Sequence, residues 1–130
     1  MAKVSRYQQK ETVGRLRRGD VCLVSFDPTV GREIRKTRPA LVIQNDIGNQ
    51  YSPLTIVAAV TSQLSPQPFP VEVVVEPSNA NGLSKPSAIR LDQIRTIDGR
   101  MILKRLGSAD GATMRGVDDA IRISLGLVDL

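Results

Sequence analysis

Short stretches of apolar residues, separated by turn-forming residues, run through most of the chain. Their length and their content of Val, Ile and Thr predict strands rather than helices. The stretch RPALVIQND has a continuous apolar centre, which predicts a strand buried on both faces. We expect strands over residues 19–26, 38–46, 54–63, 71–77 and 87–98, followed by a short strand or connector over 100–107.

The segments between these strands carry loop signals. We expect a polar loop over 27–37, a turn or short loop over 47–53 and a turn-rich segment over 78–86. Residues 64–70, LSPQPFP, contain three prolines. They exclude a central strand, because proline has no backbone N–H to donate to a neighbouring strand.

The pattern changes from about Ser108. Val117, Ile121 and Leu125 recur four residues apart, which predicts an amphipathic helix at the C-terminal end. Asp118 and Asp119 are expected early in this helix, where carboxylates favour the helix dipole.

Five or six short strands and one terminal helix predict a mainly β fold, a compact barrel with the helix packed on it. Strands and helices do not alternate along the chain, so a parallel doubly wound sheet is not expected. Within residues 87–98, strand alternation places Ile89, Leu91 and Gln93 on one face.

The length of 130 residues suits one domain. Residues 1–18 show no clear period, so we predict a basic N-terminal arm over 1–18 and a single domain over 19–130. The first 38 residues hold ten Lys and Arg against four Asp and Glu, whereas the remainder is nearly balanced. Such a one-sided basic field suits a polyanion, above all a nucleic acid, and it is also a way to keep a protein soluble.

The residue inventory excludes several kinds of chemistry. There is no His and only one Cys, so structural zinc, the Ser-His-Asp catalytic triad and the Cys-His catalytic pair are excluded. Cys22 is expected to be a small buried apolar residue. One Cys and no long apolar run fit a cytoplasmic protein without a membrane span. A magnesium site stays open, without diagnostic spacing, among Asp20, Asp27, Glu33, Asp46 and Asp92.

RNA cleavage is one reaction that needs none of the missing groups. The 2′-OH of RNA can attack the adjacent phosphate if the protein orients the chain and stabilises the developing charge. Arg suits this because its planar fork binds two phosphate oxygens, and a Thr hydroxyl can hold a third. The segment REIRKTR (32–38) offers Arg and a carboxylate, and VTSQ (60–63) offers hydroxyls. Each also has a structural explanation, as the start of a strand or as the cap of a strand end.

Three motifs, taken in order, resemble one known family. The segment RRGDVCLVSFDPTVGREIRKTRPALVIQND resembles the opening of MazF/PemK-type toxins, the mRNA interferases of bacterial type II toxin–antitoxin pairs. IVAAVTSQ resembles the family's second motif, which ends in a Thr, and LDQIRTID resembles its third. The resemblance runs from about Arg18 to Leu130 and includes the C-terminal helix.

The resemblance implies an SH3-like β-barrel of the CcdB/PemK kind with a C-terminal helix, assembled as a homodimer. It implies sequence-specific, cofactor- and metal-independent cleavage of single-stranded RNA, leaving 2′,3′-cyclic phosphate and 5′-OH ends. A MazE-type antitoxin would block the RNA groove with an acidic tail. The implied catalytic residues are Arg38, Thr61 and Glu33. The residues implied to bind RNA are Arg32, Arg35, Lys36, Thr37, Ser62, Gln63, Asp92 and Gln93.

The loop after residue 30 departs from the family pattern, which usually reads Gly-Ser-Glu-Gln. Here it reads Gly-Arg-Glu-Ile over residues 31–34, so the recognised RNA sequence is not carried over. Two other functions stay open. One is a gyrase-inhibiting toxin of the CcdB type, which shares the fold. The other is an RNA-binding barrel without catalysis, which the 3% content of aromatic residues disfavours because single-strand binders stack bases on aromatic rings.

Overall fold

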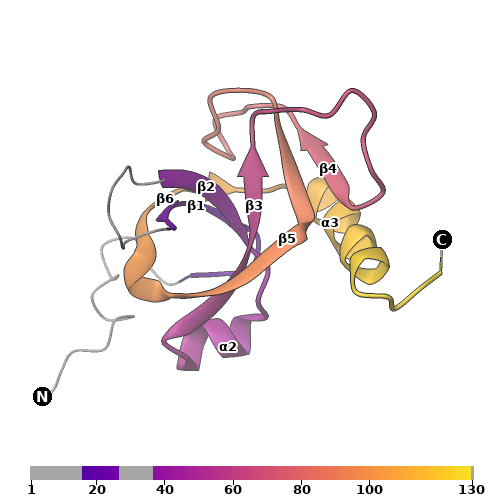
Figure 1. Ribbon diagram of the computed structural model, residues 1–130. Helices are drawn as coiled ribbons and strands as arrows, with labels where there is room; N and C mark the ends of the chain where they lie inside the picture. The colour runs from indigo at the N-terminus through magenta and orange to yellow at the C-terminus, as the bar shows by residue number, and fades with distance from the viewer. Residues whose placement is uncertain (1–15, 27–36, 130) are drawn as a thin grey trace, which may run out of the picture.

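The computed structural model describes residues 16–26 and 37–129. This part of the chain contains six strands, two α-helices and one 3₁₀ turn (Figure 1). In chain order they are β1 (Asp20–Ser25), β2 (Thr37–Val42), α2 (Asp46–Tyr51), β3 (Leu54–Thr61), β4 (Glu72–Val75), β5 (Ser87–Asp98), η2 (Gly99–Met101), β6 (Ile102–Ser108) and α3 (Gly111–Ser124).

The six strands form one antiparallel sheet in the order β4-β5-β3-β2-β1-β6. Figure 1 shows the sheet curling into an open barrel, with α3 against its outer side beside β4 and β5. The short helix α2 lies at the opposite end from the loop that joins β3 to β4. This arrangement confirms the predicted mainly β, SH3-like barrel with a C-terminal helix.

Alternate residues of the strands belong to two separate apolar clusters. The cluster inside the barrel includes Cys22, Val24, Ala40, Val42, Val57, Ile97 and Ile102. The cluster between the sheet and α3 includes Val21, Leu41, Ala58, Val60, Ile89, Leu91 and Val117. The predicted burial of β2 on both faces is confirmed, because Ala40, Leu41 and Val42 have no exposed surface. Position along a strand therefore decides whether a side chain faces the barrel interior or the helix.

The predicted strands are all present, and β5 has the predicted bounds. Residues 64–70 and 78–86 contain no strand, as predicted. The prediction of a turn or short loop over 47–53 is wrong, because residues 46–51 form the helix α2. The side chain of Asn45 caps it by accepting a hydrogen bond from the Gly48 N–H. A helix of six residues is too short to show a helical period in the sequence.

The C-terminal helix is confirmed, but the predicted role of two carboxylates in it is wrong. Helix α3 begins after Asp110, whose side chain accepts a hydrogen bond from the Thr113 N–H at 2.8 Å. This bond lowers the pKa of Asp110. Asp118 and Asp119 lie in the second half of the helix, where no N-terminal dipole reaches them. They form ion pairs instead, Asp118 with Arg18 and Asp119 with Arg122.

The end of the predicted basic arm is tied to the barrel. Leu16 is buried in the inner cluster. The backbone N–H of Arg18 donates to Asp46 at 2.6 Å, and its Nε donates to the carbonyl of Ile43 at 2.9 Å. Its guanidinium also pairs with Asp118. Residues 1–15 lie outside the described part, so the division at residue 18 stays a prediction.

A close backbone contact fixes the turn after β4 against β6. The Ser108 N–H donates to the Ala80 carbonyl at 2.8 Å. A Cβ added at Gly107 would overlap that same carbonyl oxygen. Glycine is therefore required here by close approach of two backbone segments.

We expect Gly107→Ala to lower the free energy of unfolding by about 3 kcal/mol or more, the upper end of overpacking costs. Backbone atoms must move to make room, since the overlapping group is not a flexible side chain. The matched control is Gly111→Ala at the start of α3, where the nearest atom would lie 3.5 Å away. Chemical denaturation of the three proteins measures both values. Equal stability of the two variants would contradict the proposed constraint.

Candidate functional site

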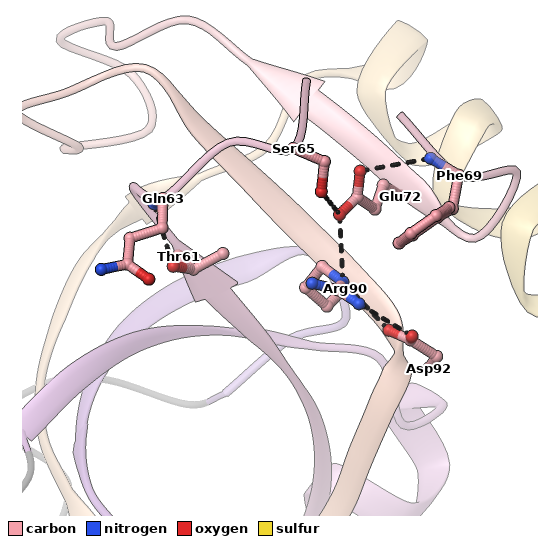
Figure 2. A network of polar contacts seen from close by, with 7 residues as sticks. All are labelled: Thr61, Gln63, Ser65, Phe69, Glu72, Arg90 and Asp92. Atoms are coloured by element: carbon pink, nitrogen blue, oxygen red, sulfur yellow. Dashed lines mark hydrogen bonds and ion pairs between the residues drawn. The ribbon is translucent and has the colours of Figure 1, made fainter. Parts of the chain in front are cut away.

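Thr61 is the last residue of β3 and is half-buried. Its hydroxyl oxygen accepts a hydrogen bond from the Gln63 N–H at 3.0 Å (Figure 2). A hydroxyl that accepts this bond still has its own proton to donate. Ser62 and Gln63 follow as exposed residues of the loop. The end of β3 therefore presents a positioned hydroxyl donor beside exposed polar groups.

Arg38 lies near the start of β2, directly opposite Val24 of β1, and is exposed. Strand β2 pairs with β3 through Ala40 and Ala59. Continuing this antiparallel register by two residues brings Arg38 level with Thr61 and onto the same face of the sheet. Ala40 belongs to the inner cluster, so both side chains lie where the barrel interior opens at this end. Two predicted site residues, far apart in sequence, thus share one end of the barrel.

Arg90 of β5 lies on this same face, and the sequence analysis missed it. It is paired across the sheet with Ala59 of β3 and with Glu72 of β4. A signal was present in the sequence, since Arg90 is a charged residue between the buried Ile89 and Leu91. Strand alternation then sends the arginine to the face away from α3, which is the face that carries Thr61.

Arg90 is held between two carboxylates. Its guanidinium forms two hydrogen bonds with Asp92, from Nε at 3.1 Å and from Nη2 at 2.9 Å. Its Nε also lies 3.2 Å from an oxygen of Glu72 (Figure 2). The Arg90 side chain is only 18% exposed, whereas the Asp92 side chain is 39% exposed. The pair is therefore partly screened by solvent.

Glu72 is a buried carboxylate whose oxygens are both engaged. Its side chain is 1% exposed. One oxygen accepts from the Ser65 hydroxyl at 3.1 Å and lies next to Arg90. The other accepts from the Phe69 N–H at 3.3 Å. A buried carboxylate with this set of partners holds the β3–β4 loop to β5, because burial of an ionised group requires such compensation.

Asp92 and Gln93 lie on an irregular part of β5. The pairing with β3 shifts between Ala58 and Ala59, whose partners are Ile94 and Arg90. The intervening residues of β5 form a bulge, and Asp92 and Gln93 are exposed on it. The predicted common face of Ile89, Leu91 and Gln93 is therefore wrong at Gln93, since a bulge breaks the alternation.

The contact between Arg90 and Asp92 changes the pKa of both side chains. The hydrogen bonds from Arg90 hold the pKa of the Asp92 carboxyl below its usual range. The same bonds, with the charges of Asp92 and Glu72, raise the pKa of Arg90. Both groups are therefore ionised near neutral pH.

Several predicted site residues lie outside the described part of the chain. They are Arg32, Glu33, Arg35 and Lys36, which belong to the segment 27–36 that precedes β2 in the sequence. Thr37 begins β2 and is exposed beside Arg38.

Three of the candidate magnesium ligands hold separate structural contacts. Asp20 accepts from the Arg17 N–H and pairs with Arg105, Asp46 accepts from Arg18, and Asp92 pairs with Arg90. Within residues 16–26 and 37–129, no group of three or more His, Cys, Asp or Glu side chains is placed to hold a metal ion. The same residues contain no helix long and apolar enough to cross a membrane.

The sequence of this chain matches one known protein family. The family model described as PemK-like, MazF-like toxin of type II toxin–antitoxin system matches residues 17–125. This chain belongs to that toxin family. The expected kinship with MazF/PemK toxins is thereby confirmed over nearly the whole described part.

Similar proteins align with this chain over most of their own length. Endoribonuclease EndoA of Bacillus subtilis is 43% identical over 114 residues, which cover 88% of this chain and 97% of that protein. A MazE–MazF crystal structure from Deinococcus radiodurans aligns with a TM-score of 0.72 and 26% identity, over 88% of this chain and 98% of that one. A mycobacterial endoribonuclease in complex with its cognate antitoxin aligns with a TM-score of 0.70 over 88% and 99% of the chains. At 23% identity, this last likeness supports the fold.

The lowered pKa of Asp92 predicts a pH-dependent contribution to stability. A group whose pKa is lower in the folded state stabilises fully above its unfolded pKa, near 3.9 for Asp, and loses that contribution as the pH falls through the folded value. We expect Asp92→Asn to be less stable than the wild type at pH 7, by less than about 1 kcal/mol because the pair is partly exposed. In urea titrations the difference should shrink as the pH falls below about 3.9 and through the lower folded-state pKa of Asp92, and it should vanish once the carboxyl is protonated in both states. A difference that stays constant down to acid pH would contradict this assignment.

Proposed function

We propose that this protein is the toxin of a type II toxin–antitoxin pair and acts as a sequence-specific endoribonuclease on single-stranded RNA. The observation that carries the proposal is the pairing of Ala40 in β2 with Ala59 in β3, because this register, extended by two residues, would bring Arg38 level with Thr61 at one end of the barrel. Membership of the toxin family and the high identity to an endoribonuclease from Bacillus subtilis support it.

Arg38 and Thr61 supply what transesterification of RNA requires of a protein. The RNA 2′-oxygen loses its proton and attacks the adjacent phosphorus, and the bond to the 5′-oxygen of the next nucleotide breaks. That oxygen takes a proton from water, so the products are a 2′,3′-cyclic phosphate and a 5′-OH. The Arg38 guanidinium binds two phosphate oxygens as negative charge develops on them, and the Thr61 hydroxyl donates to a third. Both groups stand on strands, which hold them more rigidly than a loop would.

The remaining predicted residues act around this pair. We propose Glu33 as the carboxylate that receives the 2′-OH proton. Residues of the segment before β2, at the start of β2, in the loop after β3 and on the β5 bulge bind the flanking RNA: Arg32, Arg35, Lys36, Thr37, Ser62, Gln63, Asp92 and Gln93. The proposed mechanism uses no metal ion, since the nucleophile belongs to the substrate. We propose that the basic arm over residues 1–18 adds attraction for phosphates, and the family model, which begins at residue 17, leaves most of this segment outside the matched region.

We propose a homodimer and a MazE-type antitoxin as partners, with the protein acting in the cytoplasm. The Deinococcus radiodurans structure contains MazE together with MazF. An acidic antitoxin segment suits the positive end of the barrel at Arg38 and the neighbouring basic loop. A gyrase-inhibiting toxin and a non-catalytic RNA-binding barrel are the alternative functions. Neither function requires an Arg and a Thr at the same level on neighbouring strands.

We expect Arg38→Lys and Thr61→Val each to reduce RNA cleavage at least about 100-fold, as removal of one donor to a developing anion does. Lysine keeps the charge of Arg38 but loses its two-pronged fork, and valine keeps the shape of Thr61 but loses its hydroxyl. Thr61→Ser, which retains the hydroxyl, should keep most activity. The assay incubates purified protein with a long single-stranded RNA in EDTA and maps fragment ends, which should carry 2′,3′-cyclic phosphates.

Arg122→Ala on α3 and Thr96→Ala on β5 are the matched controls, because both residues are exposed and lie away from the Arg38–Thr61 end. Circular dichroism confirms that each variant folds. Full cleavage by both Arg38→Lys and Thr61→Val would remove this pair from the mechanism. Intact RNA with wild-type protein would favour the other functions, with gyrase-dependent DNA breaks indicating one and salt-sensitive RNA binding the other.

A further inference from the structure

Phe69 exposes an aromatic ring near the proposed active site. It lies in the proline-rich loop between β3 and β4, and 51% of its surface is exposed. Moving an aromatic ring out of water lowers the free energy of the system. A ring that is half-exposed on an ordered loop is therefore available to bind a ligand. Figure 2 shows the ring directed from the loop toward Arg90 and Asp92.

The loop holds this ring in one place. Pro68 and Pro70 flank Phe69, and each restricts its own backbone. The Phe69 carbonyl accepts from the Glu72 N–H at 2.9 Å, and the Phe69 N–H donates to the Glu72 carboxylate at 3.3 Å. Because the Glu72 side chain is 1% exposed and also contacts Arg90, the loop is tied to the sheet beneath it. A backbone held in this way lowers the conformational entropy that the loop loses when Phe69 binds a ligand.

The charges beside the ring favour an uncharged ligand. The Arg90 Cζ lies 5.7 Å from the centre of the Phe69 ring. This guanidinium is flanked by two carboxylates, Glu72 at 3.2 Å and Asp92 at 2.9 Å. One cation between two anions has no net attraction for a phosphate. A neutral planar group that stacks on the ring and on the guanidinium plane meets no such penalty.

The ring stands close to the proposed catalytic pair. Thr61 is paired with Ala88 across the sheet, and Arg90 lies two residues further along β5 on the same face. Strand geometry puts the backbones of Thr61 and Arg90 about 8 Å apart. A chain of RNA whose phosphate is held at Thr61 therefore brings a neighbouring base within reach of Phe69.

We propose that Phe69, backed by Arg90 and held by the buried carboxylate of Glu72, is a stacking site for one unpaired nucleobase close to the cleaved phosphate. The inference rests on the proposed RNase function and adds to it a base-binding residue that contacts no phosphate. Stacking accepts any base, so this site fixes the position of the RNA chain more than its sequence.

The test is a cycle that combines Phe69→Ala with removal of single bases from the substrate. A short RNA with one mapped cleavage site is prepared with an abasic nucleotide at each position in turn around that site. We expect one abasic position to lower kcat/KM of the wild type about 10-fold to 100-fold, the range of losses that follow from removing a stacked base. In Phe69→Ala, which lacks the ring, the intact RNA should show the same loss, and the abasic change should have no further effect.

Phe69→Tyr and Gln67→Ala are the matched controls. Tyrosine retains the ring and should restore the wild-type response, and Gln67 is an exposed neighbour in the same loop whose substitution leaves the ring in place. If the losses in kcat/KM from Phe69→Ala and from the abasic change were additive at every position, the stacking site would be overturned. The RNase function would not be affected by that result, provided that the wild type cleaves the intact RNA. A purely structural role of Phe69 would give that additive result. Failure of the wild type to cleave intact RNA would overturn both proposals.

Discussion

The antiparallel pairing of β3 with β2 on one side and β5 on the other is the constraint on which the site depends. Each backbone hydrogen bond of these ladders sets which residues lie level across the sheet and which face they occupy. A slip of one residue would turn Thr61 toward α3 and Val60 toward the open end. The two apolar clusters disfavour such a slip, since it would remove Val57 and Val60 from the clusters in which they pack, on opposite faces, and would turn the Thr61 hydroxyl toward the apolar cluster at α3.

A cluster of charged residues on β4 and β5 fixes the position of the β3–β4 loop. Glu72 is almost fully buried, yet both of its oxygens are engaged, and Arg90 supplies the compensating charge. The same arginine meets Asp92 on the bulge. This network ties a loop without regular structure to a rigid strand. Its polar partners would be costly to leave unmatched, so the position of the β3–β4 loop is set by them.

These two features divide the proposed work on RNA. In the proposed mechanism, Arg38 near the start of β2 and Thr61 at the end of β3 contact the phosphate and carry the chemistry. The loop presents Phe69, which offers an uncharged surface for a base. Separation of the two contacts lets positive charge concentrate on Arg38 and the adjoining basic segment, while the neutralised Arg90 supports stacking. The chain contains few aromatic residues, so a single well-placed ring has a large share of any base contact.

Much of the fold followed from the sequence because local signals agree with the tertiary structure. Apolar runs marked β1, β2 and β3, prolines excluded a strand over 64–70, and the four-residue spacing around Val117 marked α3. The short helix α2 and the bulge in β5 did not follow, since neither leaves a periodic pattern long enough to detect. Asp118 and Asp119 were misplaced for a different reason. The apolar period does not mark where the helix begins, and its start is set by the cap at Asp110.

For the site, the sequence alone determined the available chemistry: arginines, a threonine and carboxylates, with no histidine. It also marked Arg38 and Thr61 through their motifs. Only the tertiary structure decided that Ala40 pairs with Ala59 two residues from each of them, that Arg90 pairs with that same Ala59, and that Glu72 is buried and bound to the backbone of Phe69. Such relations come from pairing between strands distant in sequence, and the pattern within each strand does not specify its partner or its offset.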